Sequence, residues 1–67
     1  MYQRDFEIAA NTMINEKRRF IVRMTSGKTL RGTNYRIVDA TEGDVIAVHH
    51  GSAYVGYVDL RCVEAVT

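Results

Sequence analysis

Residues 19–39, RFIVRMTSGKTLRGTNYRIVD, place the strongest limit on how this chain of 67 residues can fold. Apolar residues alternate with others over 20–24, as in a half-buried strand, and a Ser-Gly-Lys turn follows. In the next strand the apolar phase shifts from Leu30 and Gly32 to Tyr35. A phase shift beside a glycine predicts a bulge or a sharp bend. We therefore expect the second strand to bend at Gly32, as strands do where a small sheet curls into a barrel.

The segment before this stretch, residues 2–17, has helical periodicity. Its apolar residues from Tyr2 to Met13 fall on one face, whereas Ile8 points away from that face. Three more strands are expected downstream, over residues 44–50, 53–58 and 62–66. One helix and five strands predict a mainly β fold, in which a strongly bent five-stranded antiparallel sheet forms a small open barrel. We expect a single domain, with the helix over 2–17 and the barrel over 19–66.

The chain is short for a stable monomer. A domain of this size buries only about 60% of its unfolded surface, and disulfides, a metal or self-association usually supply further stability. Cys62 is the only cysteine, so no disulfide can form within the chain, and we expect this thiol to be a small core residue. A single thiol also favours a reducing, cytoplasmic location. A structural metal also has little support in the sequence, as argued below, so self-association is the source of stability that remains.

The residues of the third and fourth predicted strands favour pairing with another chain. Residues 45–58, VIAVHHGSAYVGYV, contain no lysine, proline or carboxylate. Monomeric sheets usually protect exposed edges with such residues, so we expect these strands to pair with another subunit. Tyr54 and Tyr57 have opposite parity in this segment, so one of the two is expected to face outward.

Catalytic and metal chemistry have little support in the sequence. No hydroxyl lies in an evident relay with a histidine and an acid, so we do not expect an enzyme, a cofactor or a small-molecule substrate. His49 and His50 are neighbours in a strand and point to opposite faces, so they cannot chelate one metal ion together. A ring could still bring one histidine from each subunit together. No apolar run is long enough to cross a membrane, so no membrane partner is expected.

Charge is distributed unevenly along the chain. Residues 1–38 contain eight Lys and Arg against three acidic residues, whereas residues 39–67 contain one against five. This asymmetry fits a polyanion-binding face, and it fits equally two complementary surfaces that meet in an oligomer. The basic residues 17–19 follow the predicted helix, where positive charge also stabilises the helix dipole.

Two glycines and an aspartate frame the bent strands, with small apolar residues around them. These positions are Val22, Met24, Gly27, Leu30, Gly32 and Asp39, with a weaker match at Val58, Val63 and Val66. On these residues the chain resembles the Sm/Sm-like family (LSm and Hfq-like proteins) over essentially its whole length. The resemblance implies an SH3-like barrel and a homo-oligomeric ring of about five to seven subunits. In that family the fourth strand of one subunit pairs with the fifth strand of the next.

Members of this family mostly bind single-stranded, often uridine-rich RNA around the pore, or serve as scaffolds. Two loops of this chain depart from the family pattern. The loop after Asp39 has no aromatic residue and contains carboxylates, and Asp59 stands where the family has an arginine. Because a carboxylate repels phosphates, we expect the usual pore pocket to be lost, with Arg61 as the one candidate to replace it.

Two interpretations therefore stay open. The first is a ring that binds single-stranded RNA as an RNA-chaperone-type scaffold through a basic surface. The second is a non-catalytic structural or protein-interaction ring that has lost RNA binding. The candidate RNA-binding residues are Lys17, Arg18, Arg19, Arg23, Lys28, Arg31 and Arg61. The atypical pore loops contain Asp39, Thr41, Glu42, Asp44 and Asp59. The expected subunit interface comprises Tyr54, Val55, Tyr57, Val58, Cys62, Val63 and Val66.

Overall fold

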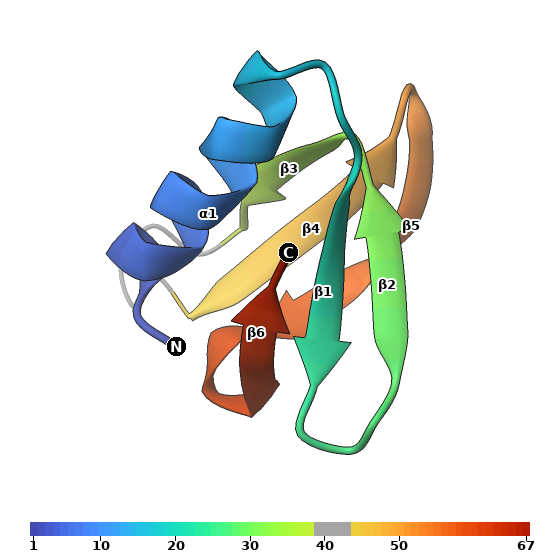
Figure 1. Cartoon of the computed structure of the whole chain (residues 1–67). Coiled ribbons are helices and arrows are strands. Elements are labelled where there is room, and N and C mark those ends of the chain that lie inside the picture. The colour runs from blue at the N-terminus through green and yellow to red at the C-terminus, as the bar shows by residue number, and fades with distance from the viewer. Residues whose placement is uncertain (39–43) are drawn as a thin grey trace.

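The computed structural model describes residues 1–38 and 44–67, which form one helix followed by six antiparallel strands (Figure 1). Helix α1 spans Gln3–Asn15, and a single turn of 3₁₀ helix, η1, spans Leu60–Cys62. The strands are β1 (Phe20–Met24), β2 (Thr29–Gly32), β3 (Asn34–Ile37), β4 (Val45–His50), β5 (Ala53–Asp59) and β6 (Val63–Val66).

The strands form two antiparallel sheets of three strands each. Sheet A has the order β2-β1-β6, and sheet B has the order β3-β4-β5. The mainly β architecture with an N-terminal helix agrees with the sequence prediction. The strand count differs because the predicted second strand appears as β2 and β3, one in each sheet, and the described strands do not close into a barrel.

The interruption between β2 and β3 is Thr33, directly after Gly32, where the sequence predicts a bend. A methyl group on the Cα of Gly32 would lie 2.5 Å from Cγ1 of Val48 and 2.9 Å from the carbonyl oxygen of His49. The next residue, Thr33, donates its backbone N–H to that same oxygen at 2.8 Å. Only glycine allows so close an approach of the strand to β4, and the predicted bend is confirmed.

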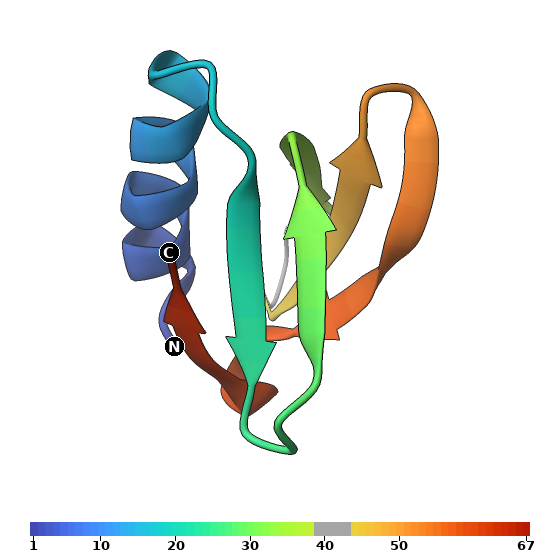
Figure 2. The ribbon, with the colours of Figure 1, turned by 45° about the vertical axis from the view of Figure 1, so that its right-hand side comes forward.

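The core lies between the two sheets and α1. Figure 2 shows α1 beside β1 and β6, with β4 and β5 on the other side of β2. Phe6 of α1 packs edge-to-face on Phe20 and Tyr35, with ring centroids 6.1 and 5.3 Å apart, and the Tyr35 hydroxyl donates to Oδ1 of Asn11 at 3.0 Å. The buried core residues are Phe6, Ala10, Phe20, Val22, Ile46, Val48, Val58, Leu60 and Val63.

Two side chains do not lie where the sequence places them. Tyr2 is 81% exposed because it occupies the residue before the first helical turn and not the packed face of α1. Cys62 is exposed, so its prediction as a core residue is wrong. The turn η1 is the reason: residues three apart in a 3₁₀ helix share a face, and here Leu60 and Val63 take the buried one. Ile8 is exposed, as predicted.

Candidate nucleic-acid interface

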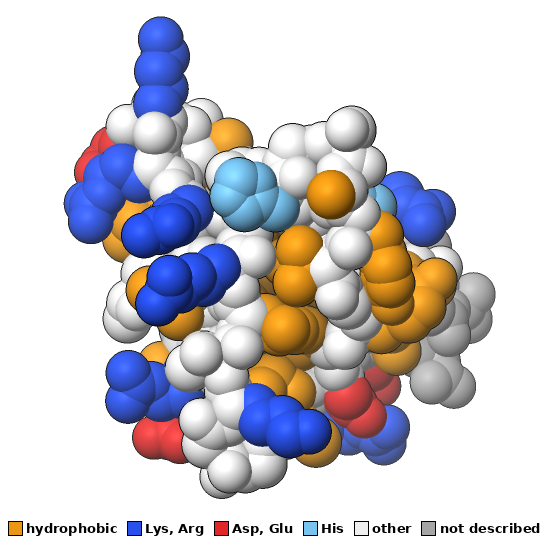
Figure 3. Space-filling model, turned by 90° about the vertical axis from the view of Figure 1, so that its right-hand side faces the viewer, with side chains coloured by type: hydrophobic (Ala, Val, Ile, Leu, Met, Phe, Trp, Pro, Cys, Tyr) orange, Lys and Arg blue, Asp and Glu red, His pale blue; other side chains and the backbone are white. Residues whose placement is uncertain are grey.

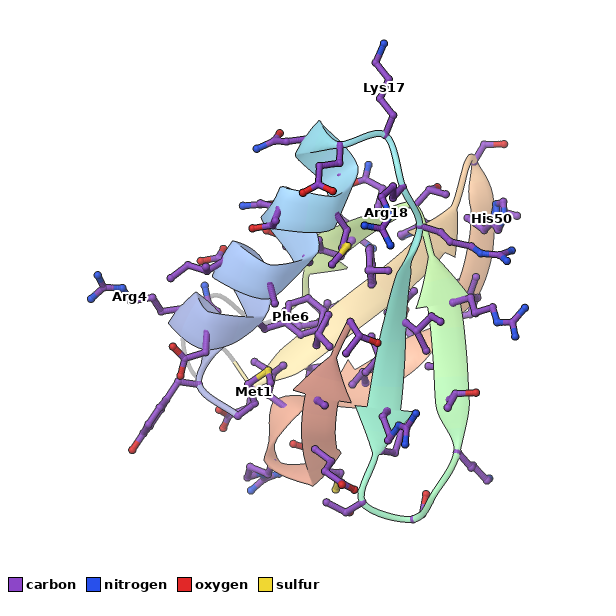
Figure 4. The ribbon with its side chains drawn as sticks, viewed as in Figure 1. Met1, Arg4, Phe6, Lys17, Arg18 and His50 are labelled. Atoms are coloured by element: carbon purple, nitrogen blue, oxygen red, sulfur yellow. The ribbon has the colours of Figure 1, made fainter. Side chains whose placement is uncertain are left out.

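The basic residues between α1 and β1 follow a tightly closed helix end. The backbone N–H of Lys17 donates to the carbonyl of Ile14, and that of Arg18 donates to the carbonyl of Met13, both at 2.9 Å. This Schellman motif puts Lys17 at φ 58°, a left-handed position that usually holds glycine. The Lys17 side chain extends away from the body of the molecule (Figure 4). The motif therefore holds a lysine in strained backbone at a prominent point of the surface.

Three further basic residues lie on sheet A. Arg31 is opposite Ile21 and Arg23 is opposite Thr29, so both arginines stand on the outer face of the sheet, where they are exposed. Lys28 lies in the turn between β1 and β2, at the end of the sheet away from α1's last turn. Figure 3 shows Lys and Arg side chains along one side of the molecule. We call the following residues the basic surface: Lys17, Arg18, Arg19, Arg23, Lys28 and Arg31.

Little within the described residues neutralises this basic surface. Arg18 lies 3.3 Å from Oε1 of Glu16, and both side chains are more than half exposed. Exposed pairs of this kind contribute little and are screened by salt. Five of the six residues make no ion pair with any described residue. The basic surface thus keeps its positive charge available for an anionic ligand.

Arg61 is in a different situation, because its guanidinium is bound to Asp59. The Nε and Nη2 atoms of Arg61 donate to Oδ1 and Oδ2 of Asp59 at 3.1 and 2.9 Å. The Arg61 backbone N–H also donates to Oδ1, which caps η1. Hydrogen bonds from the Arg61 side chain and backbone lower the pKa of Asp59, and the same pairing raises the pKa of Arg61. Arg61 therefore forms an intramolecular ion pair with Asp59, and we do not count it as part of the basic surface.

The two loops that form the pore pocket in the resembled family meet at their described ends. The backbone N–H of Leu60 donates to the carbonyl of Asp44 at 2.7 Å, and the nitrogen of Met1 donates to the carbonyl of Leu60 at 2.8 Å. Asp44 and Asp59 are the carboxylates described at this junction. The remaining loop residues named from the sequence lie outside the described residues: Asp39, Thr41 and Glu42. The described part of the junction therefore holds two carboxylates, the Met1 ammonium and an arginine side chain that is already paired.

The residues predicted for a subunit interface divide into two groups. Val58 and Val63 are buried in the core of the same chain, and Val66 packs partly against it. The others, Tyr54, Val55, Tyr57 and Cys62, are exposed. Within the described residues, β5 pairs only with β4, and β6 pairs only with β1. Each of these strands therefore has one backbone edge to which no other described strand pairs.

The two tyrosines of β5 lie on one face, and the prediction from their parity that only one faces outward is wrong. A register shift places Val48 opposite Gly56 and His49 opposite Tyr54, which leaves Val55 as an extra residue. This bulge cancels the opposite parity, and the rings of Tyr54 and Tyr57 are 53% and 61% exposed. Gly56, directly after Val55, is the one signal in β5 that could have indicated the bulge, because a glycine within a strand often marks one.

Among the described residues, no group of three His, Cys, Asp or Glu side chains could hold a metal ion. In the same part of the chain, no helix is long and apolar enough to cross a membrane. Comparison with protein-family models, with curated proteins and with solved structures gives no match. The N-terminal helix followed by antiparallel strands is consistent with an Sm-like fold.

Proposed function

We propose that the chain is a subunit of a homo-oligomeric, Sm-like ring of about five to seven copies, in which β5 of one subunit pairs with β6 of the next. The unpaired edges of β5 and β6 carry this proposal. The two edges belong to different sheets, so their pairing is head-to-tail, and head-to-tail contacts close into rings when the rotation allows it. Neither strand contains a lysine or proline of the kind that protects an edge in monomeric sheets, and their two carboxylates are Asp59, which Arg61 binds, and Glu64.

The ligand that we propose for this ring is single-stranded RNA, bound along the basic surface as on an RNA-chaperone-type scaffold in the cytoplasm. Six exposed cations favour a polyanion, and one weak ion pair competes for them within the described residues. The Arg61–Asp59 pair is the reason that we do not propose a pocket at the pore, because the one cation expected to replace the family's arginine already binds a carboxylate. The open alternative is a protein-interaction ring without RNA.

The ring is tested by native mass measurement at micromolar concentration. Val55 is the extra residue of the bulge, so Val55→Pro removes one N–H from β5 at a point where the register with β4 is already interrupted. We expect this variant to be monomeric and Val55→Thr, which keeps the N–H and the branched side chain, to form the wild-type assembly. Circular dichroism controls for folding. A monomeric wild-type protein would contradict the proposal.

RNA binding is tested by fluorescence anisotropy with labelled oligouridylate and oligoadenylate at several salt concentrations. Each phosphate that the protein contacts adds about 0.7 to the slope of log affinity against log salt for single strands. The triple change Lys17→Ala, Arg18→Ala, Arg19→Ala should weaken binding and flatten this slope. Absence of binding at low salt, with the assembly intact, would favour the protein-interaction ring.

A further inference from the structure

The outer face of sheet B carries an exposed group of aromatic rings. The ring of Tyr54 lies between the other two, with centroid distances of 6.0 Å to His49 and 5.1 Å to Tyr57. His49 is opposite Tyr54 in the β4–β5 register, and the bulge at Val55 brings Tyr57 to the same side. We call His49, Tyr54 and Tyr57 the aromatic surface. Figure 3 shows hydrophobic side chains gathered on the side of the molecule where β5 lies.

The strands beneath this surface add polar and positive groups to the same face. Arg36 is opposite Ala47, and Ala47 is opposite Tyr57, so the three side chains form one row across sheet B. Asn34 is opposite His49 in the neighbouring row. Strands β3 and β4 contain no carboxylate, and the one in β5, Asp59, is bound by Arg61. The aromatic surface is therefore bordered by a cation and by hydrogen-bonding groups, without a free acid in its own strands.

We propose that the aromatic surface binds bases of single-stranded RNA by stacking, while Arg36 contacts a phosphate. Aromatic rings beside a cation are the elements from which sequence-tolerant single-strand sites are built. The site lies on sheet B and is distinct from the basic surface, which runs from the end of α1 over sheet A. It does not require the ring, because edge pairing uses backbone groups in the plane of the sheet and the side chains stand perpendicular to it.

The charge of this face decides between RNA and a second copy of the chain as the occupant. Arg36 lies in the same row as Tyr57, and the strands of this face offer no free carboxylate, so the same face of a second copy would bring cation against cation. Arg36 is exposed and makes no ion pair with any described residue. A phosphate can form an ion pair with this guanidinium, and the planar rings can stack on a base.

The test is anisotropy with a labelled oligouridylate of about twelve nucleotides, which is long enough for one stacking site. Loss of one stacked base corresponds to roughly a five- to hundred-fold loss of affinity, and we expect a loss in this range for Tyr57→Leu and for Tyr54→Leu. Tyr57→Phe keeps the ring and should bind as the wild type does. Tyr2→Leu is the matched control, since Tyr2 is exposed but lies at the start of α1.

A second probe, an abasic oligonucleotide of the same length, separates stacking from charge. If bases stack on the tyrosines, the wild-type protein should bind the abasic oligonucleotide more weakly than oligouridylate. The Tyr57→Leu variant should then bind the abasic oligonucleotide about as well as the wild type does. If the tyrosine variants bind oligouridylate as the wild type does, the aromatic site is overturned, while binding that depends on Lys17, Arg18 and Arg19 still supports the proposed function. If Tyr57→Leu disperses the assembly as Val55→Pro does, the rings face another subunit, and the stacking site is likewise overturned.

Discussion

Both carboxylate oxygens of Asp59 accept hydrogen bonds from the guanidinium of Arg61, at 3.1 and 2.9 Å. The pair is neutral overall and engages two donors of the Arg61 guanidinium with a carboxylate. Asp59→Asn removes that carboxylate and keeps a side-chain oxygen to cap η1. We expect this variant to bind oligouridylate several-fold more tightly. The slope of log affinity against log salt should steepen by the amount expected for one more phosphate contact. An unchanged affinity and slope would show that RNA stays away from this junction.

The same pair predicts how Asp59 titrates. Its pKa lies below the ordinary value of 3.8 because the side chain and backbone of Arg61 donate to the carboxylate. A lowered pKa in the folded state stabilises the fold fully at neutral pH, and this contribution disappears as the pH falls through the lowered value. Carboxyl chemical shifts should give a midpoint below 3.8 for Asp59. The midpoint should rise in Arg61→Met, and an unchanged midpoint would contradict the pairing.

Gly32→Ala should destabilise the protein. The added methyl group would lie 2.5 Å from Cγ1 of Val48 and 2.9 Å from a backbone oxygen, and backbone cannot give way cheaply. Overpacking of this kind costs about 1–3 kcal/mol of unfolding free energy. Gly56→Ala is the matched control, because its methyl group would lie 3.7 Å from Leu30 in ordinary contact. Urea unfolding at one protein concentration measures both, and equal stabilities would contradict the close approach at Gly32.

Lys17→Gly should stabilise the protein by up to about 1 kcal/mol, because glycine adopts a positive φ without strain. Lys17→Ala removes the same charge but keeps a Cβ at φ 58°, so its stability should match that of the wild type. Thermal unfolding compares the three proteins. The two variants should lose RNA affinity equally, since both lack the ammonium group. Destabilisation by Lys17→Gly would mean that the side chain supports the fold.

Phe6→Ala should be the most damaging of these substitutions. The side chain is fully buried and contacts the rings of Phe20 and Tyr35. Removing a buried phenylalanine costs about 3–5 kcal/mol, which is a large part of the stability of a small domain. Ile8→Ala, on the exposed side of the same helix, should change the unfolding free energy by less than about 1 kcal/mol. Similar losses for both would contradict the placement of α1.

The sequence predicts features whose signals are local. Helical periodicity identifies α1, and the phase shift beside Gly32 identifies the bend, because each depends on residues within one or two turns of chain. Tyr54 and Cys62 are misplaced for one shared reason. A bulge in β5 and a 3₁₀ turn before β6 each change the phase of the chain; Gly56 beside Val55 is a local signal of the bulge, whereas no glycine or proline marks the 3₁₀ turn. The bulge and the 3₁₀ turn therefore determine which face the exposed side chains after Val55 occupy.

The continuity of β2 and β3 through Gly32 has a consequence for how copies of the chain would be arranged. The edges that we propose to pair lie in different sheets, β6 in sheet A and β5 in sheet B, and the chain passes from one sheet to the other between β2 and β3, so the bend there contributes to the angle between the sheets. When β5 of one copy joins β6 of the next, that angle becomes the rotation from copy to copy. In the ring that we propose, a residue in the interior of each subunit would thereby influence the rotation from copy to copy, and a change at Gly32 would alter the number of subunits without any change at the contact itself.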